Sequence, residues 1–170
     1  TVYIEEGATL RIGPNTQIIL DGPNAILEIR GNLVLEDGAT FQPIGGANGQ
    51  GFVRFNQPYV DASTAPTLID VGEGSSMIFE APNSATKVLE VASTDFWIND
   101  QGRDFNFVLR NARAEMAHNA MMNLGCRVTF DGALIEKLPS AGHYRGVVLW
   151  NMGYSQLIRN STFKEASEAV

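Results

Sequence analysis

The chain has 170 residues, of which 44% are hydrophobic and 18% charged, and its formal net charge is −7. This composition is that of a folded globular chain, and the length suits one domain with a continuous core. The acidic balance argues against nucleic acid and against an anionic membrane surface as partners, because both need clustered Lys and Arg. No apolar run approaches the roughly 18 residues of a membrane-spanning helix, so we expect no direct membrane insertion.

Short segments of alternating apolar residues open the chain and predict β-strands. Gly, Pro, Asn or Asp separates each segment from the next, and the gaps are too short to hold a crossover helix. The segments are residues 2–4, 9–12, 17–20, 25–30, 33–35 and 40–41.

Two internal sequence similarities relate these segments to one another. Residues 2–10 are matched by residues 33–41 at an offset of 31, and residues 19–24 by residues 78–83 at an offset of 59. A repeat of this length is typical of a solenoid, in which one strand-and-turn unit stacks on the next. Three short strands in each repeat of about 30 residues predict a parallel β-helix of about five to six coils.

Alternation along the strands also predicts which side chains line the bore, since successive residues of a strand point to opposite faces. Counterparts across the repeat should then stack on one another. The predicted inward pairs are Leu20 with Phe79, Leu27 with Leu89 and Ile29 with Val91.

Two stretches interrupt the regular pattern. Residues 42–66 are rich in turn residues and predict loop insertions around a strand at 52–55. Residues 111–125 are rich in Ala and Met and predict an insertion with a turn or two of helix, ended by Gly125. We expect a single domain over residues 1–170, and an uncapped section of a longer rod, because both ends lie inside repeat-like sequence.

The later strands share an apolar run followed by Asn or Asp and a small residue, as in residues 108–112, 128–133 and 157–163. Here the chain resembles the right-handed parallel β-helix repeat of the pectin-lyase-like superfamily, with Asn160 where such repeats place a corner asparagine. The first half, with Gly-Ala-Thr-Leu and Ile-Gly-Pro-Asn, looks like the β-helical segments of large secreted or surface proteins of Gram-negative bacteria. The expected fold class is therefore all-β, a right-handed parallel β-helix.

The same resemblance implies a polysaccharide lyase or a glycoside hydrolase as the enzymatic alternative. Residues 96–100, Phe-Trp-Ile-Asn-Asp, resemble the Trp-Ile-Asp-His motif of pectate lyases, but Asn99 and Asp100 stand where Asp and His belong. The Arg-x-Pro-x-x-Arg element of those enzymes is absent, as are the acidic and Gly-His-Gly clusters of polygalacturonases. We therefore predict no catalytic residue and no cofactor.

Candidate metal ligands are few. Asp95, Asp100 and Asp104 lie within ten residues of one another, and such hard oxygen ligands suit Ca²⁺, although a solvated acidic loop is the more ordinary interpretation. His118 and His143 lie far apart along the chain, with no third ligand in the sequence. Their spacing predicts no metal site.

Other residues each have a functional and a packing interpretation. Trp97, Trp150 and Tyr144 either form a sugar-stacking platform on an exposed face or pack within the fold. Cys126, the single cysteine, cannot form an intrachain disulfide and is expected to be buried in a strand.

One outward feature bears on function. Ile19 and Ile78, and likewise Ile26 and Val88, occupy outward positions that the repeat makes equivalent. An isolated rod would carry polar residues there, so these rows imply cover by the chain's own loops or by a neighbouring copy.

The sequence therefore favours a structural, non-catalytic extracellular rod of a bacterial surface adhesin or filament, located outside the cell or at its surface. Its expected partners are other copies, in a homo-oligomer or a bundle of parallel rods. The alternative is a carbohydrate-active or carbohydrate-binding β-helix whose partners are surface glycans. An enzyme groove would gather Asp, Arg and Lys on one sheet, whereas the sequence scatters its arginines between coils, at Arg54, Arg103, Arg110 and Arg127.

Overall fold

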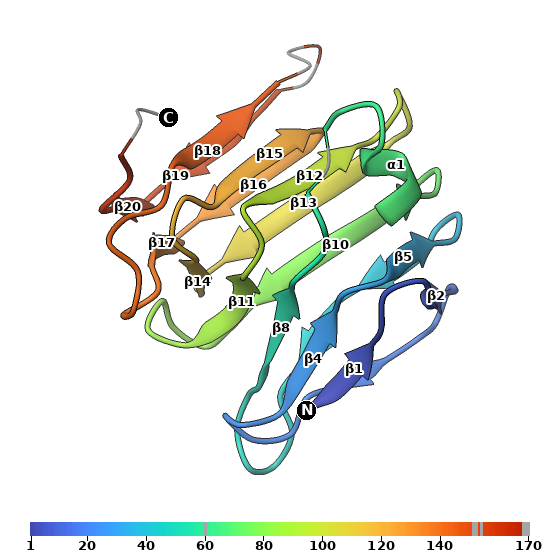
Figure 1. The fold of residues 1–170 in the computed structure, drawn as a ribbon. Coiled ribbons are helices and arrows are strands. Elements are labelled where there is room, and N and C mark those ends of the chain that lie inside the picture. Colours follow the sequence, from blue (N-terminus) through green and yellow to red (C-terminus); the bar gives the residue numbers. More distant parts are fainter. Residues whose placement is uncertain (60, 151–152, 154, 168–170) are drawn as a thin grey trace.

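The fold is all-β, with parallel strands in stacked sheets (Figure 1). The computed structural model describes residues 1–59, 61–150, 153 and 155–167. Within those residues the only helix is α1 (Ala65–Leu68), a single turn with proline near its start. Residues 168–170, part of the predicted uncapped end, lie outside the described residues.

The largest sheet has seven strands, here called the long sheet, and it runs the length of the molecule. Each strand between its two edge strands pairs in parallel with the one before and the one after. In order they are β1 (Val2–Ile4), β4 (Ile26–Ile29), β8 (Phe52–Phe55), β11 (Lys87–Val91), β14 (Arg113–Met116), β17 (Leu134–Lys137) and β20 (Thr162–Lys164).

The remaining strands form four smaller parallel sheets. A five-stranded sheet contains β6 (Thr40–Phe41), β10 (Ser75–Glu80), β13 (Phe105–Arg110), β16 (Arg127–Asp131) and β19 (Leu157–Arg159). Two three-stranded sheets contain β2 (Thr9–Ile12), β5 (Asn32–Leu35) and β9 (Ile69–Val71), and β12 (Asp95–Asn99), β15 (Met121–Gly125) and β18 (Gly146–Leu149). The last pairs β3 (Ile18–Ile19) with β7 (Pro43–Ile44).

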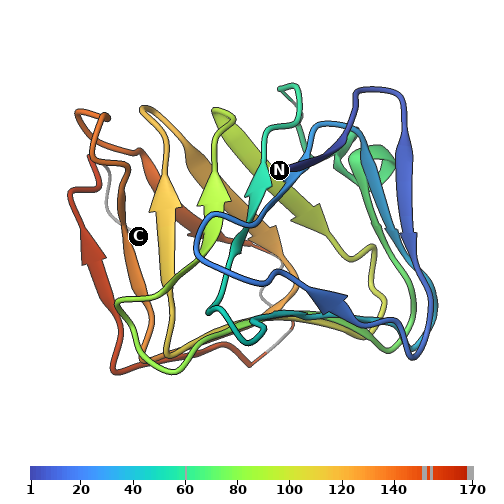
Figure 2. The same ribbon diagram turned by 90° about the horizontal axis from the view of Figure 1, so that it is seen from below.

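The order of the strands makes the arrangement solenoid-like. From β8 the chain runs through β9 in a three-stranded sheet and β10 in the five-stranded sheet, then returns to the long sheet as β11. We call each such circuit a pass. Figure 2 shows successive passes side by side from the N-terminal to the C-terminal end.

The strand register confirms two of the predicted inward pairs. Leu27 pairs with Val53 and Val53 with Leu89, so Leu27 and Leu89 lie in one file two passes apart. Ile29 and Val91 are joined in the same way through Phe55. These side chains are buried, as the alternation of the strands requires.

The offset of 31 between residues 2–10 and 33–41 was wrong as a stacking repeat. Val2 pairs with Leu27 in the long sheet, whereas Leu33 pairs with Leu10 in a three-stranded sheet. The two segments look alike because each is an apolar strand followed by a turn that needs glycine, at Gly7 (φ 81°) and at residue 38 (φ 71°). The similarity of the two segments therefore reflects a shared local pattern, a strand followed by a glycine turn, and its offset is not the length of a pass.

Phenylalanine side chains from three different sheets meet in the bore. The Phe55 and Phe96 rings, from β8 and β12, have centroids 4.8 Å apart, and Phe96 lies 6.2 Å from Phe107 of β13. Along the five-stranded sheet the aromatic contacts continue from one pass to the next, with Phe107 6.3 Å from Phe130. Tilted and edge-on rings at these distances pack favourably and fix the separation between the sheets.

The predicted interruptions differ in outcome. Residues 42–66 contain β7, a tight turn closed by Gly46 and Gly49, β8, and a long connection to α1. Residues 111–125 are not an insertion, because they form β14 and β15, joined by a short turn. Their alanines and methionines, apart from the half-buried Ala117, are buried by the neighbouring passes, so tertiary packing overrides the helix propensity of these residues.

Candidate functional site

The predicted assembly residues differ in exposure. Ile19 is 54% exposed, Ile26 and Ile78 are half-buried, and Val88 is only 2% exposed. Val88 is buried because the register shifts between Lys87 and Leu89, leaving it in an irregular position of β11. Three of the four side chains therefore remain available at the surface.

The register also corrects the equivalence of Ile19 and Ile78. Ile19 pairs with Ile44. Phe41 pairs with Met77, so Ile44, three residues after Phe41, lies level with Glu80, three residues after Met77. Ile78 instead pairs with Val108 in the next pass. The outward apolar residues thus belong to two neighbouring files and not to one.

A chain of ion pairs crosses the outer face of the long sheet, and it is the largest cluster of functional groups in the described part of the chain. Outward side chains of successive strands fall in one file, in which Glu28 pairs with Arg54 and Arg54 with Glu90. Further along this file three carboxylates follow one another, and cations from another position of the same strands stand between them. Acidic and basic groups therefore alternate along the ion pairs. The members of this ion-pair chain are, in order, Glu5, Arg30, Glu28, Arg54, Glu90, Lys87, Glu115, Arg113, Glu136 and Lys164.

Each inner cation of the ion-pair chain holds carboxylates of two neighbouring passes. Arg54 lies 3.0 Å from Glu28 and 2.6 Å from Glu90, and Lys87 lies 2.6 Å from Glu115 while also bonding Glu90. The carboxylates are more deeply buried than the cations, with Glu28 3%, Glu90 5% and Glu115 6% exposed. Buried carboxylates require such partners, because an unpaired charge at that depth is very costly.

Two opposing influences act on Glu28. Burial would raise the pKa of Glu28, but hydrogen bonds from Asn56, Arg30 and Arg54 outweigh burial and hold it below its ordinary value of 4.5. Asn56 donates to Glu28 Oε1 at 3.1 Å. Glu28 is therefore an ionised, fully engaged carboxylate at neutral pH and not a proton donor.

The sequence did not reveal the ion-pair chain, because its members are spread from Glu5 to Lys164 and only the strand register aligns them. Arg54, one of the arginines that looked scattered, is its central cation. Arg110 belongs to a second alternating file on the five-stranded sheet, 3.5 Å from Glu80, and that file continues with the pair of Arg159 and Asp131 at 2.8 Å.

The three calcium candidates do not converge. Asp95 begins β12 and Asp100 follows its last residue, which separates the two by about 16 Å along an extended strand. Asp104 is exposed and forms an ion pair with Arg127 at 3.1 Å. Within the described residues, no group of three or more His, Cys, Asp or Glu side chains is close enough to hold a metal ion.

Each of the buried aspartates has its own environment. Burial raises the pKa of Asp95, against the attraction of Arg145 and a hydrogen bond from Asn123 at 3.4 Å. Asp100 is completely buried, its Oδ1 accepts the Gly102 N–H at 2.9 Å, and its Oδ2 has no partner among the described residues. The Asp100 carboxylate lies near the Cys126 thiol, and that thiol is itself fully buried.

The two tryptophans meet on the outer face of the β12–β15–β18 sheet. Trp97 of β12 and Trp150, which follows β18, have ring centroids 5.8 Å apart at an angle of 65°. Gly125 of the intervening strand permits the contact, because a Cβ there would overlap the Trp150 ring. Both indole N–H groups are buried without a partner among the described residues. Tyr144 is fully buried and does not belong to this pair.

The structure also shows where the histidines and the cysteine lie. His118 and His143, distant in sequence, have ring centroids 4.8 Å apart. Cys126 is fully buried, as expected, and burial together with the nearby Asp100 carboxylate raises the pKa of its thiol. A thiol in such surroundings is an inert packing group.

Comparison with known proteins assigns no function to these surfaces. The described residues contain no helix with the length and apolarity needed to span a bilayer. No protein-family model, no curated protein and no solved structure matches this chain.

Proposed function

We propose that the chain is a section of a right-handed parallel β-helix of five to six coils, with the fold of the pectin-lyase-like superfamily, and that it serves as a structural, non-catalytic rod. The rod would belong to a surface adhesin or filament of a bacterium, outside the cell. The observation that carries this proposal is the ion-pair chain from Glu5 to Lys164.

The ion-pair chain supports a structural role for two reasons. Its cations bridge carboxylates of consecutive passes, so each pair ties one pass to the next. Its inner carboxylates are already matched by cations, as for Glu28, and are not left poised for acid–base chemistry. An extended network of this kind resists separation of the passes under heat or load better than isolated pairs do.

Assembly with other copies is the second part of the proposal. Ile19 projects from β3, and Ile78 lies beside Val108 on the outer face of the five-stranded sheet. In the same file the polar Thr129 follows Val108, and Leu157, 43% exposed, follows Thr129 in the last pass. Burying each such side chain against a neighbour contributes roughly 1.5–3 kcal/mol before the costs of association, and the contacts would repeat along a long rod.

Light scattering of the wild type beside an Ile19→Glu/Ile78→Glu variant tests the assembly. We expect the wild type to be oligomeric and the variant to have a lower mass. Tyr59→Glu, a matched change at a side chain 71% exposed in the connection to α1, should leave the mass unchanged. A wild type that stays monomeric at high concentration would contradict lateral packing between copies.

The Trp97–Trp150 pair favours carbohydrate binding as the second candidate function. Aromatic rings on an outer face stack on sugar rings, and the Asn123 amide and Asp95 carboxylate beside them supply hydrogen-bonding groups. Binding of a soluble glycan should change the fluorescence of these two tryptophans, which are the only ones in the sequence. Unchanged fluorescence across a panel of acidic and neutral polysaccharides would contradict carbohydrate binding by this pair.

The enzymatic alternative is tested directly. Purified protein incubated with polygalacturonate, with and without Ca²⁺, should release no unsaturated oligosaccharides, because Asp100 and the Cys126 thiol near it are both fully buried and out of reach of a polymer substrate. Reproducible release that Asp100→Ala abolishes would overturn the structural proposal in favour of a lyase.

A further inference from the structure

We infer that His118 and His143 form a binding site for a borderline divalent transition-metal ion of the Zn²⁺ class. They are the only two histidines in the sequence. His118 lies in the turn between β14 and β15, and His143 lies one pass later, in the connection from β17 to β18. The stacking of passes thus brings together two imidazoles that lie far apart along the chain.

The distance between the rings suits shared coordination. An imidazole nitrogen about 2.0–2.1 Å from Zn²⁺ places the ring centre roughly 3.2 Å from the ion, so two rings about 100° apart around the ion have centres roughly 4.9 Å apart. The centroids of His118 and His143 are 4.8 Å apart. The rings are inclined at 62°.

The hydrogen bonds of His143 prepare one nitrogen for a metal. Its Nε2 lies 2.9 Å from Asn119 Oδ1, and because an amide oxygen only accepts, Nε2 carries the proton and Nδ1 keeps the lone pair. Metal-binding histidines almost always donate their second ring N–H to such an oxygen. The Asn119 N–H also donates to the His143 carbonyl at 3.2 Å, which fixes the two turns to each other.

The surroundings admit an ion from solvent. His118 is exposed and His143 is half-buried, so an ion and its bound water can reach both rings. A Cβ at Gly142 would stand at ordinary contact distance, 3.6 Å, from His118 Nδ1, so His118 lies close to the connection that carries His143. The pair is therefore close, accessible and held by backbone.

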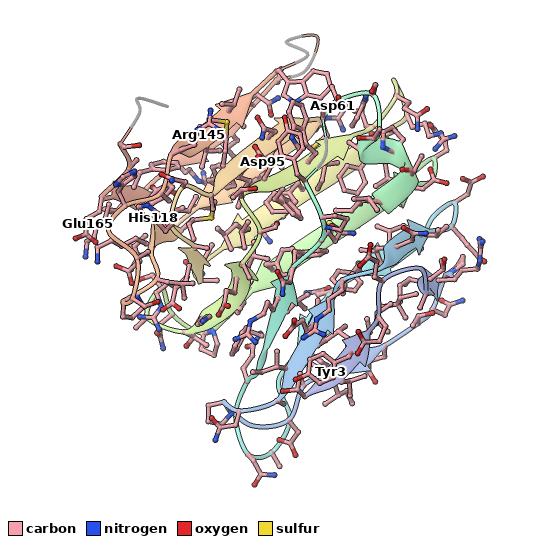
Figure 3. All side chains as sticks on the ribbon, in the orientation of Figure 1. Tyr3, Asp61, Asp95, His118, Arg145 and Glu165 are labelled. Carbon is pink, nitrogen blue, oxygen red and sulfur yellow. The ribbon has the colours of Figure 1, made fainter. Side chains whose placement is uncertain are left out.

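A carboxylate lies at the corresponding position of the next pass. Tyr144 forms a parallel bridge with Ala166, which places Glu165 level with His143 on the following pass. Figure 3 shows Glu165 on the same side of the molecule as His118. Its carboxylate is turned to Lys137, 3.9 Å away, a weak and partly exposed ion pair. It adds negative charge near the site and is not one of the two inferred protein ligands.

Titration calorimetry with ZnCl₂ tests the inference on the intact chain. At about pH 7.5 we expect one ion bound per chain, and at about pH 5 we expect the affinity to fall, because protons compete with a metal ion for its ligand atoms. His118→Ala and His143→Ala should each weaken binding at least about tenfold, and the double variant should abolish it. Circular dichroism checks that these variants remain folded.

Two carboxylate variants serve as controls. Glu165→Gln should weaken binding less than either histidine variant, and Glu73→Gln, at an exposed acidic corner elsewhere, should not change it. Absence of binding, binding that survives in the double histidine variant, or an equal loss in Glu73→Gln would each overturn the inference. The buried Cys126 thiol offers no alternative ligand at the surface.

Discussion

Gly125 is the residue that lets the two indoles meet, since the Trp150 ring lies over it. Gly125→Ala should displace Trp150, separate it from Trp97 and destabilise the fold by about 1–3 kcal/mol, the usual cost of overpacking. Tryptophan fluorescence and thermal unfolding measure both effects. Gly142→Ala is a suitable control, because its new Cβ would stand at ordinary contact distance from its neighbours. Equal behaviour of the two variants would contradict the packing described for Trp150.

Leu27 occupies the inward file with Val53 and Leu89 and is 6% exposed. Leu27→Asp places an unpaired charge in the bore, at a cost of several kcal/mol against a total stability of about 5–15 kcal/mol. We expect the variant to be unfolded by circular dichroism at room temperature. Tyr59→Asp introduces the same charge at an exposed position and should unfold at the wild-type temperature.

At the scale of strands, Arg54 links three elements, because it projects from β8 and bonds carboxylates on β4 and β11. Arg54→Met retains the apolar stem but leaves Glu28 and Glu90 each short of a cation. Urea unfolding should show a loss of about 3 kcal/mol, the lower end for breaking a buried pair, since other partners remain. Arg11→Met breaks an exposed pair 3.8 Å from Glu36 and should cost below about 1 kcal/mol.

The same strands predict how stability depends on pH. The lowered pKa of Glu28 means that the folded state holds this carboxylate ionised more firmly than the unfolded state does. Its contribution is therefore present above its ordinary pKa of 4.5 and is lost as the pH falls through the lower folded value. Urea unfolding across this range should show the wild type losing stability toward acid, and Arg54→Met losing less. A steeper acid loss in the variant would contradict the role given to Arg54.

At the scale of the whole molecule, the sequence predicted the class of fold because strand alternation and turn residues are local signals. Leu27 and Leu89 were paired correctly from that alternation, and Asn160, with a φ of 51°, takes the left-handed backbone expected of a corner residue. Residues 111–125 were misjudged, because their Ala and Met content favours helix when neighbouring strands are unknown.

The candidate sites were largely invisible in the sequence for a different reason. Glu28, Arg54 and Glu90 become neighbours only through register, and the passes that separate them differ in length. The pairing of His118 with His143 depends on the same unequal spacing. No fixed period relates these positions, so a search for regular repeats could not align them.

The unequal passes have a consequence for how such a molecule changes over evolution. Ala114 and Ile135 are stacked neighbours joined by a short pass, whereas Val53 and Leu89 are equally good neighbours although their pass is longer and also contains α1. The extra residues leave the sheets at a corner and return without disturbing the strands on either side. Insertions at exposed corners are therefore well tolerated, and the exposed Tyr59, which lies beyond the hydrogen-bonded Asn56 and Gln57, marks a natural place to graft a foreign peptide for display.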